Sequence, residues 1–394
     1  MTEHKPLDEA VPAAEPDQRE KAKRRIRSPR AWFVAKSPFK KGLLSAIALF
    51  LVVVLYSISV ALLAPGTDPV SARLAEWGRN HGLGALVTLA ENAQYNLDKP
   101  KVGGTLDSSQ KSLISKTVTP QATSIPSIVQ PTLPGEGDLK TVVSKDGQPA
   151  IQIAYIRPDK QHTSYLAAVA LMNSSLVSFV QHPGFSEPGN AARLSSTDLL
   201  AGSDLSNLAA TFNSAFKLKD SQGGYYQNGV MVKPLVDGKA SLVIYKDGHA
   251  DIGAWGSELT MRPDVVSVRQ NLSPLIDGGE ISTSIKKNVF VNWGFTVKNS
   301  YYVWRSGVGV TASGDIVYAA GNALSVASMA NVLKAAGAVR AMELDINQEW
   351  ISYMYYTPDA TTGAPTPTKL LGFTRPGNRY FNPSSRDFFA VYLR

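Results

Sequence analysis

The alternation of apolar and polar stretches divides the chain into segments of different character. Residues 42–64, GLLSAIALFLVVVLYSISVALLA, form a run of 23 residues without a charge, long enough for a helix to cross about 30 Å of hydrocarbon. Residues 1–41 are polar, and basic residues lie next to the apolar run. The pattern predicts a single-pass protein of the cell membrane, with a basic cytoplasmic tail (1–41), a transmembrane helix in the lipid bilayer (42–64) and an extracellular remainder. A cleaved signal peptide is the alternative, but its apolar core is usually shorter.

Two segments of different composition follow the apolar run. Residues 65–98 include DPVSARLAEWGRNHGLGALVTLAENAQYN, in which Asp68 is a candidate N-cap and Gly82 interrupts an apolar stripe of helical spacing. This predicts a membrane-proximal stalk made of a broken helix or a helix pair, with a partner-binding helix as the alternative. Residues 99–138 have no aromatic residue and are rich in Ser, Thr, Pro and Gly, which predicts an extended linker.

From residue 139 to residue 394, short apolar runs of strand length alternate with turn residues. The clearest runs are AIQIAYIR (150–157), YLAAVALM (165–172), SLVSFVQH (175–182), ASLVIYKDG (240–248) and the final FFAVYLR (388–394). Turn residues predict β-hairpins at 246–256 and 307–321, and helical spacing predicts helices at 196–213 and 325–336. Many strands with a few packed helices predict an α+β domain with mostly antiparallel sheets.

Composition excludes several classes of protein. The 394 residues include no cysteine, so disulfide frameworks, zinc–thiolate sites and thiol nucleophiles are excluded. The formal charge is +8, but no basic stripe with interleaved aromatic residues occurs, so no nucleic acid partner is expected. No dinucleotide or P-loop motif is present, and no cofactor is predicted. His182 and Glu187 are two metal ligands without a third, so no metal site is predicted, and dependence on a divalent metal stays open.

The stretch AMELDINQEW (341–350) contains the most unusual arrangement of polar residues. On a strand, successive side chains point to opposite faces, so Glu343, Asp345 and Asn347 would share one face. Two carboxylates at this spacing can divide acid and base roles in cleaving a glycosidic bond. The alternative is a salt-bridged rim in which Arg305 or Arg340 is the partner.

Three blocks of sequence resemble the phosphodiester glycosidase family, the uncovering-enzyme-like domain. The longest is RSGVGVTASGDIVYAAGNALSVASMANVLKAAGAVRAMELDINQEW (305–350), which resembles the family's C-terminal signature. ATFNSAFK (210–217) and QNLSPLIDGGEI (270–281) are similar to two upstream segments, in the same order. The resemblance covers about residues 145–394, and implies a phosphodiester glycosidase-like domain at 139–394.

The resemblance also implies a set of site residues. It places Asn213, Arg305 and Asp345 in the shared site, with the loop of Asp277 and Gly278 beside it. Asp345 would stabilise or attack the sugar carbon, and the guanidinium of Arg305 would bind phosphate oxygens. Asn213 would orient a sugar hydroxyl. Two of these residues have a structural alternative: an ion pair for Arg305, and a turn or capping role for Asn213.

The remaining polar residues of the strand leave the activity open. Glu343 is a base or a bystander, and Asn347 a substrate-binding residue on the pocket floor. The family has a glycine tract after its aspartate, whereas this chain has 346–349, Ile-Asn-Gln-Glu. A glycine tract lets backbone N–H groups approach an anion closely, so its loss changes the substrate or the catalytic power.

The predicted function is therefore a membrane-anchored extracellular hydrolase. It would cleave the glycosidic bond of sugar-1-phosphodiesters in glycans of the cell envelope or in exported polysaccharides. The alternative is a catalytically silent module of the same fold that binds glycans or acts as a scaffold.

Overall fold

The computed structural model describes residues 38–97, 100–115, 124–189, 194, 196–286, 293 and 302–394. Nearly all of the predicted cytoplasmic tail lies outside the described residues. The chain divides into two compact units, 1–60 and 61–394, and each is described by itself.

Helix α2 (Pro38–Leu62) carries the apolar run of the N-terminal unit. Its segment Phe39–Leu62 contains an 18-residue window with a mean hydropathy of 2.6, and the segment is long and apolar enough to cross a membrane by length and composition. A membrane anchor and a signal sequence both have these properties.

The predicted helix pair is present in the second unit. Helices α3 (Val70–Asn80) and α4 (Gly84–Leu97) are separated by a turn around Gly82, which confirms the predicted break. The predicted N-cap is wrong, because Pro69 is the capping residue and no side chain bonds to the first turn. The carboxylate of Asp68 instead pairs with Arg375.

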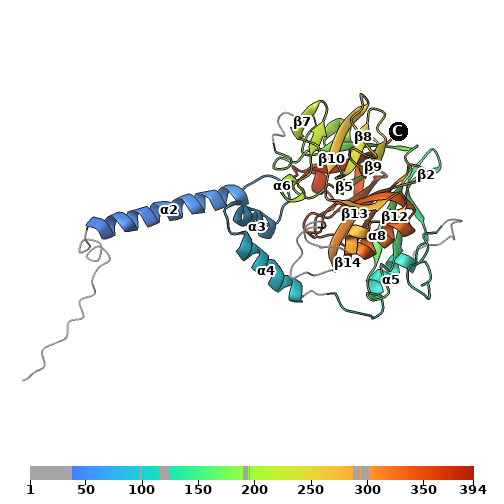
Figure 1. The fold of residues 1–394 in the computed structure, drawn as a ribbon, viewed down its shortest axis with the longest axis horizontal. Helices are drawn as coiled ribbons and strands as arrows, with labels where there is room; N and C mark the ends of the chain where they lie inside the picture. The colour runs from blue at the N-terminus through green and yellow to red at the C-terminus, as the bar shows by residue number, and fades with distance from the viewer. Residues whose placement is uncertain are drawn as a thin grey trace, which may run out of the picture. The chain divides into compact units, whose positions relative to one another are not determined.

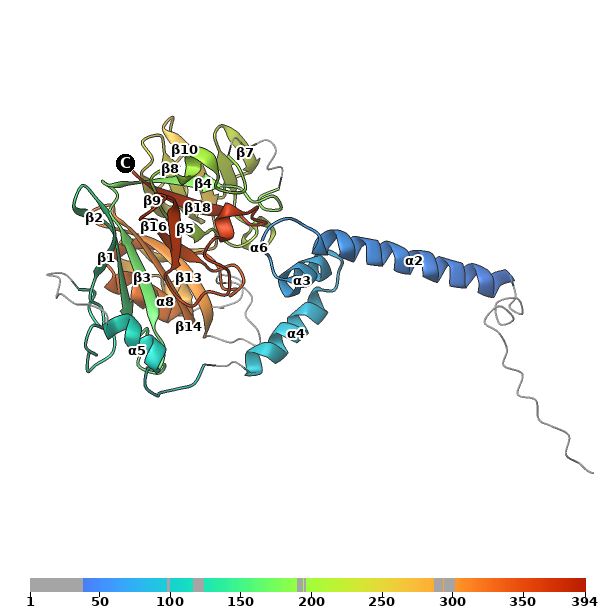
Figure 2. The ribbon, with the colours of Figure 1, turned by 180° about the vertical axis from the view of Figure 1, so that it is seen from behind.

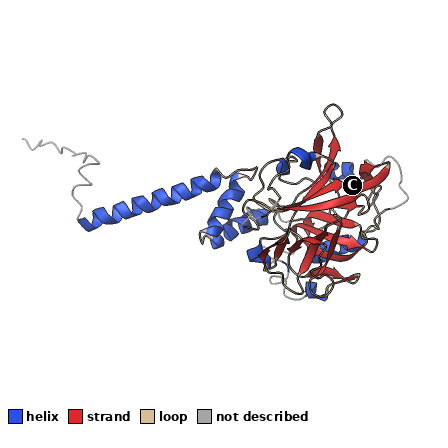
Figure 3. Ribbon diagram, turned by 90° about the horizontal axis from the view of Figure 1, so that it is seen from above, coloured by secondary structure: helices blue, strands red, loops and turns tan. Residues whose placement is uncertain are grey.

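Antiparallel sheets build most of this unit, and the strands are concentrated in its globular part (Figure 3). The largest sheet has the order β1 (Lys140–Lys145), β2 (Gln148–Ile156), β3 (Ala167–Met172), β14 (Ile316–Leu324), β13 (Val303–Thr311), β15 (Ala338–Glu343), β11 (Pro274–Asp277), β12 (Glu280–Ile281). A second has the order β7 (Val230–Lys233), β6 (Tyr225–Gln227), β10 (Val265–Gln270), β8 (Ala240–Tyr245), β9 (Ala250–Ala254). The third has the order β17 (Pro365–Lys369), β16 (Tyr353–Pro358), β5 (Leu208–Asn213), β18 (Phe388–Leu393), β4 (Val177–His182) (Figure 2).

Few helices accompany these sheets among the described residues, which confirms the predicted α+β class. They are α5 (Ser108–Ser115), α6 (Leu218–Ser221), α8 (Val326–Ala335) and the 3₁₀ turns η2 (Gly202–Leu205), η3 (Thr283–Lys286) and η5 (Arg379–Phe381). Helix α8 packs against β13, β14 and β15 (Figure 1).

The local signals in the sequence predicted most elements near β13–β15 correctly. Strands β13 and β14 form the expected hairpin, and β8 and β9 form the other. Ser325 caps α8 through a hydrogen bond from the Ser328 backbone N–H, and Gly337 follows the helix at φ +93°. That left-handed conformation suits glycine, so it stops the helix and turns the chain into β15.

The helix predicted at 196–213 is wrong. The structure has the turn η2 followed by strand β5, whose six residues are all buried between β16 and β18. A strand covered on both faces needs no alternation of polar and apolar residues. Its apolar run therefore looks the same as that of a buried helix.

Two layers of apolar side chains position the sheets. The larger core fills the space between the eight-stranded sheet and the other two sheets, with residues such as Phe212, Tyr318 and Tyr353. The second core lies between α8 and the other face of the eight-stranded sheet, and includes Met329 and Leu333. The eight-stranded sheet is therefore covered on both faces.

The segment expected to be a linker contributes to this fold in the parts that the structure describes. Ile125 and Val129 are buried, and Glu136 is buried in an ion pair with Arg157 of the loop after β2, with Nη2–Oε2 at 2.7 Å. The packed structure therefore begins before residue 139.

We expect Glu136→Ala to lower the free energy of unfolding by about 3–5 kcal/mol, because it leaves the Arg157 guanidinium buried without its counter-charge. Chemical denaturation of the full-length chain followed by tryptophan fluorescence measures the change. The control is Glu280→Ala, which removes an exposed pair with Lys334 and should cost less than about 1 kcal/mol. Equal effects of the two substitutions would show that residues 124–138 are a dispensable linker.

Candidate functional site

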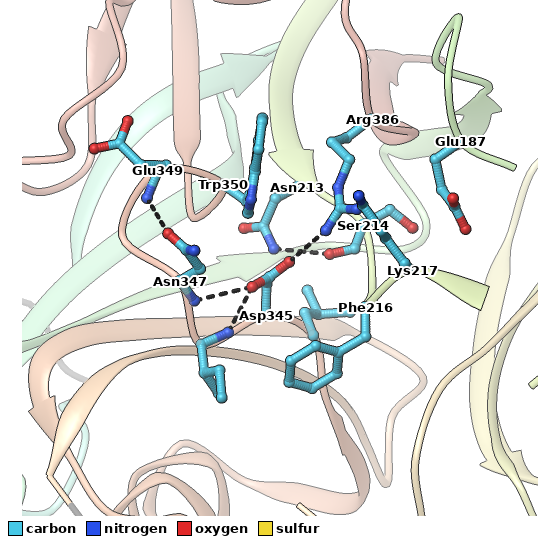
Figure 4. A network of polar contacts seen from close by, with 12 residues as sticks. Glu187, Asn213, Ser214, Phe216, Lys217, Asp345, Asn347, Glu349, Trp350 and Arg386 are labelled. Carbon is cyan, nitrogen blue, oxygen red and sulfur yellow. Dashed lines mark hydrogen bonds and ion pairs between the residues drawn. The ribbon is translucent and has the colours of Figure 1, made fainter. Parts of the chain in front are cut away.

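The ends of three strands bring the candidate site residues together (Figure 4). Asp345 lies two residues after β15, Asn213 is the last residue of β5, and Arg386 lies two residues before β18. The first strand belongs to the eight-stranded sheet and the other two to the third sheet. The site is therefore a seam between two sheets.

Asp345 is a buried carboxylate with one loose ion pair, to Arg386. Its Oδ1 accepts hydrogen bonds from the backbone N–H groups of Ile346 (2.7 Å) and Asn347 (2.9 Å). Its Oδ2 lies 3.5 Å from Nη2 of Arg386. Burial raises the pKa of Asp345, while Arg386 and these hydrogen bonds act in the opposite direction.

The regular strand expected to carry Glu343, Asp345 and Asn347 on one face does not extend over all three residues. Strand β15 ends at Glu343, and Asp345 begins a turn that its own carboxylate stabilises. The Oδ1 atom of Asn347 accepts a hydrogen bond from the N–H of Glu349 at 2.9 Å, so this side chain stabilises the next turn. The regular pleat stops at Glu343, and turn chemistry decides the directions of the later side chains.

Arg305 and Glu343 form a buried ion pair, and the nearby charge of Asp345 also acts on the Glu343 carboxyl group. Both side chains are almost fully buried, and Nη1 of Arg305 bonds to Oε1 of Glu343. The Nε atom of Arg305 also donates to the Leu324 carbonyl oxygen at 2.9 Å. Burial raises the pKa of Glu343, and Arg305 opposes that change. The geometry matches the ion-pair alternative for these two residues.

The side-chain amide of Asn213 connects strand β5 of the third sheet to the eight-stranded sheet through hydrogen bonds. Its Nδ2 donates to Ser214 O (2.8 Å) and Ser306 Oγ (3.0 Å), and its Oδ1 accepts from the Tyr318 hydroxyl (2.9 Å) and the Ser352 N–H (3.1 Å). All of its amide groups have protein partners. The contacts tie β5 to the eight-stranded sheet beside Asp345.

The loop of Asp277 and Gly278 lies away from Asp345. The loop joins β11 to β12, and the N–H of Gly279 donates to Val339 O at the start of β15. Asp345 follows the opposite end of that strand. Asp277 instead interacts with Glu258, whose pKa is raised by burial and, secondarily, by the Asp277 charge.

Four cations that the sequence patterns did not single out surround the seam. Lys217 precedes α6, and Arg375, Arg379 and Arg386 come from the loop and 3₁₀ turn between β17 and β18. The three guanidinium groups lie 5.7, 5.8 and 5.0 Å from the centre of the Trp350 ring. The run TRPGNRYFNPSSR (374–386) contains all three arginines, and this density of arginine was the available signal.

The domain itself places three carboxylates near these four cations, Asp345, Glu349 and Glu187, the last of which accepts from the Leu218 N–H (Figure 4). Burial raises the pKa of Glu349, and Arg375 and Arg379 oppose that change. Nη1 of Arg386, Nε of Arg379 and the buried hydroxyl of Ser214 have no hydrogen-bond partner among the described residues. Such a set of donors suits an anionic ligand with several oxygen atoms.

The two metal-ligand candidates have other partners. Nδ1 of His182 lies 2.9 Å from Thr197 O, and the Glu187 carboxylate accepts from the Leu218 N–H. Burial lowers the pKa of His182. No group of three or more His, Asp or Glu side chains suited to a metal ion occurs in the described part of the chain.

Comparisons with known proteins support the predicted resemblance. Residues 206–345 match the family model described as phosphodiester glycosidase, so the predicted resemblance to this family is confirmed for that segment. No curated protein matches the chain.

Solved structures with a similar chain trace include the following two. One is the zebrafish N-acetylglucosamine-1-phosphodiester alpha-N-acetylglucosaminidase catalytic domain auto-inhibited by its pro-peptide, with 15% identity, a TM-score of 0.43, and 65% of this chain and 88% of that chain covered. The other is a hypothetical protein from Synechocystis, with 12% identity, a TM-score of 0.37 and 63% of each chain covered.

We expect Arg305→Met to lower the free energy of unfolding by about 3–5 kcal/mol, because Glu343 would remain buried without a counter-charge. The double variant Arg305→Met/Glu343→Leu should recover most of that loss, since two apolar side chains can replace a buried ion pair. Denaturation of the single and double variants measures the difference. A double variant as unstable as the sum of its single variants would contradict this structural role.

Proposed function

We propose that this protein hydrolyses sugar-1-phosphodiesters and that Asp345 acts on the anomeric carbon. The observation that carries the proposal is the buried Asp345 carboxylate, which lies beside Arg386 and within a cluster of four cations. Asp345 is also the last residue of the segment that matches the family. A carboxylate next to an anion-binding group is what cleavage between a sugar carbon and a phosphate oxygen requires.

The residues divide the chemistry in a simple way. The Asp345 carboxylate stabilises or attacks the anomeric carbon as the bond from that carbon to the phosphate oxygen breaks. The bonding electrons leave with the phosphate, and water supplies the hydroxyl of the free sugar and the proton released. The second ionisation of a phosphomonoester has a pKa of about 6, so this leaving group needs no strong general acid. Glu343 has no part in the reaction, because Arg305 engages it away from solvent.

In this arrangement, cationic side chains take over the role of the missing glycine tract. Backbone N–H groups at Ile346 and Asn347 donate to Asp345 itself, so they orient the carboxylate rather than a substrate anion. The cationic side chains around Trp350 then attract the phosphate, as the backbone N–H groups of a glycine tract would do in a chain that has one. Catalysis without the glycine tract is therefore physically reasonable.

The proposed setting is the outer side of a membrane. The apolar helix α2 would anchor the chain in the bilayer as a single pass with its basic tail in the cytoplasm. The second unit would then meet phosphodiester-linked glycans of the envelope or exported polysaccharides.

We expect Asp345→Asn to reduce the release of free sugar from a UDP-sugar by at least about a thousandfold, because the amide cannot supply the negative charge. The assay uses the full-length chain in detergent, and Asp146→Asn, at an exposed position, serves as the matched control. Binding of the UDP-sugar without release, equal in the wild type and in Asp345→Asn, would refute the hydrolase and support a silent glycan-binding module.

We expect the rate of this reaction to rise with pH through a pKa above the usual aspartate value. Burial raises the pKa of Asp345, and the carboxylate acts only when ionised, so a higher pH increases the active fraction. Arg386→Met should move this acid limb to still higher pH, because it removes the cation that favours ionisation. A limb that stays in place after the substitution would show that another group controls it.

A further inference from the structure

A hollow of about 330 Å³ lies at the end of the eight-stranded sheet that is opposite to Asp345. The tip of the β13–β14 hairpin, the turn between β3 and β4, the first residues of β9 and the start of β15 surround it. Pockets for small molecules begin at about 300 Å³, so the hollow has room for a small ligand. Its lining includes Ser174, His249, Asp251, Thr311, Ala312 and Arg340.

The hollow is separate from the candidate site described above. Arg340 lies near the start of β15, whereas Asp345 follows the end of that strand, and roughly 17 Å of extended chain separates the two residues. Strand β9 of the second sheet packs against β13 and β15, so the hollow lies between the second sheet and the eight-stranded sheet. None of its lining residues belongs to the cluster of four cations around the seam.

The tips of the two hairpins that line the hollow are held in place by side-chain contacts. Asp315, in the tip of the β13–β14 hairpin, accepts a hydrogen bond from the Ser174 N–H of the β3–β4 turn at 3.0 Å. In the β8–β9 hairpin, the ring of His249 stacks on that of Tyr245 with the centroids 4.2 Å apart, and its Nδ1 pairs with Asp247. The walls therefore have a fixed shape before a ligand arrives, which lowers the entropy cost of binding.

Asp251 and Arg340 form the charged pair of the lining. Nη2 of Arg340 lies 2.7 Å from Oδ1 of Asp251, and the two side chains are 24% and 25% exposed, so solvent reaches both. Oδ2 of Asp251 and Nη1 of Arg340 have no hydrogen-bond partner among the described residues. Glu258 is close to Arg340 but is not part of the lining, and burial raises its pKa, which reduces its negative charge. The pair is therefore close to neutral and keeps one acceptor and one donor for a ligand.

A neutral sugar fits this lining better than an ion does. The charges of Asp251 and Arg340 cancel, so neither an anion nor a cation finds an unpaired counter-charge. A sugar hydroxyl both donates and accepts hydrogen bonds. Neighbouring hydroxyls of one ring can donate to the carboxylate and accept from the guanidinium, and hydrogen bonds to charged groups are the stronger ones. The ring of His249 and the methyl group of Ala312 supply apolar contact for the C–H groups of the sugar.

We propose that this hollow binds a neutral saccharide unit, with the Asp251 carboxylate as hydrogen-bond acceptor and the Arg340 guanidinium as donor. The class of ligand follows from the lining and does not depend on the activity at Asp345. The assignment of that saccharide to the glycan substrate rests on the proposed function. A glycan held in the hollow would stay on the molecule between cleavage events, which raises the local concentration of its phosphodiesters at the candidate site.

The test measures binding of D-glucose, D-galactose, D-mannose and N-acetyl-D-glucosamine to the full-length chain by saturation-transfer NMR titration, in a detergent without a sugar head group. At least one of these sugars should bind the wild type saturably. Asp251→Asn and Arg340→Gln should weaken that binding by at least about tenfold, because each removes a hydrogen bond to a charged group. Asp146→Asn and Lys334→Gln, both at exposed positions, are matched controls of the same charge change and should bind as the wild type does.

A second pair of variants tests the hollow without a change to its ion pair. Ala312→Trp places a large ring in the hollow from an exposed position of the β13–β14 hairpin and should abolish saccharide binding. Ala360→Trp, at an exposed position in the turn between β16 and β17, is the control and should leave binding unchanged. Equal unfolding midpoints of the variants and the wild type show that a loss of binding is not a loss of the fold.

The outcomes separate this site from the candidate site at Asp345. Absence of saturable binding of all these sugars by the wild type would overturn the proposal, as would binding that Asp251→Asn and Ala312→Trp leave unchanged. Asp345→Asn should bind the sugar as the wild type does, and a loss of binding in that variant alone would place the sugar at the candidate site and overturn the proposal. Asp251-dependent binding in a chain that releases no sugar from a UDP-sugar would support the saccharide site and refute the hydrolase.

Discussion

A charge that is removed from water needs an opposite charge beside it, and this constraint shapes the centre of the globular unit. Three buried pairs satisfy it at close range, Arg157–Glu136, Arg269–Asp387 and Arg305–Glu343, although Nη2 of Arg305 and Oε2 of Glu343 have no hydrogen-bond partner among the described residues. The pair of Asp345 and Arg386 is looser, at 3.5 Å, and leaves donors of the arginine without a protein partner. The tight pairs hold the framework, and the looser pair lies at the site where we propose that the substrate binds.

Hydrogen bonds between two of the sheets make the framework around that pair rigid. The amide of Asn213, at the end of β5, forms hydrogen bonds with Ser306 and Tyr318 of the eight-stranded sheet. Ser306 also exchanges backbone hydrogen bonds with residues 344 and 345. The two strand ends therefore cannot separate without the loss of several buried hydrogen bonds. A carboxylate fixed on such a seam needs little reorganisation when charge develops nearby, which is the condition for electrostatic catalysis.

The membrane-proximal segment contributes two further carboxylates, Asp68 and Glu76, to the same charge balance. Apart from the carboxylates of this segment, the candidate site contains four cations, Lys217, Arg375, Arg379 and Arg386, and the carboxylates of Asp345, Glu349 and Glu187. With Asp68 and Glu76 in place, Arg375 and Lys217 are paired. A helix that follows the apolar run in the chain thus takes part in the electrostatics of the candidate site.

Local signals in the sequence were sufficient for the elements whose stability is local. The hairpins, the capped helix 326–335 and the helix break near Gly82 follow from turn residues, caps and periodicity, which act within a few residues of chain. The same patterns placed Asp345 among the candidates. They misassigned 208–213, since a strand that is buried on both faces shows no alternation of polar and apolar residues, and they left open whether Arg305 binds phosphate or forms an ion pair. Which arginine meets which carboxylate depends on strand ends that are far apart in the chain, and only the packing of the sheets brings residue 386 to residue 345 and residue 76 to residue 217.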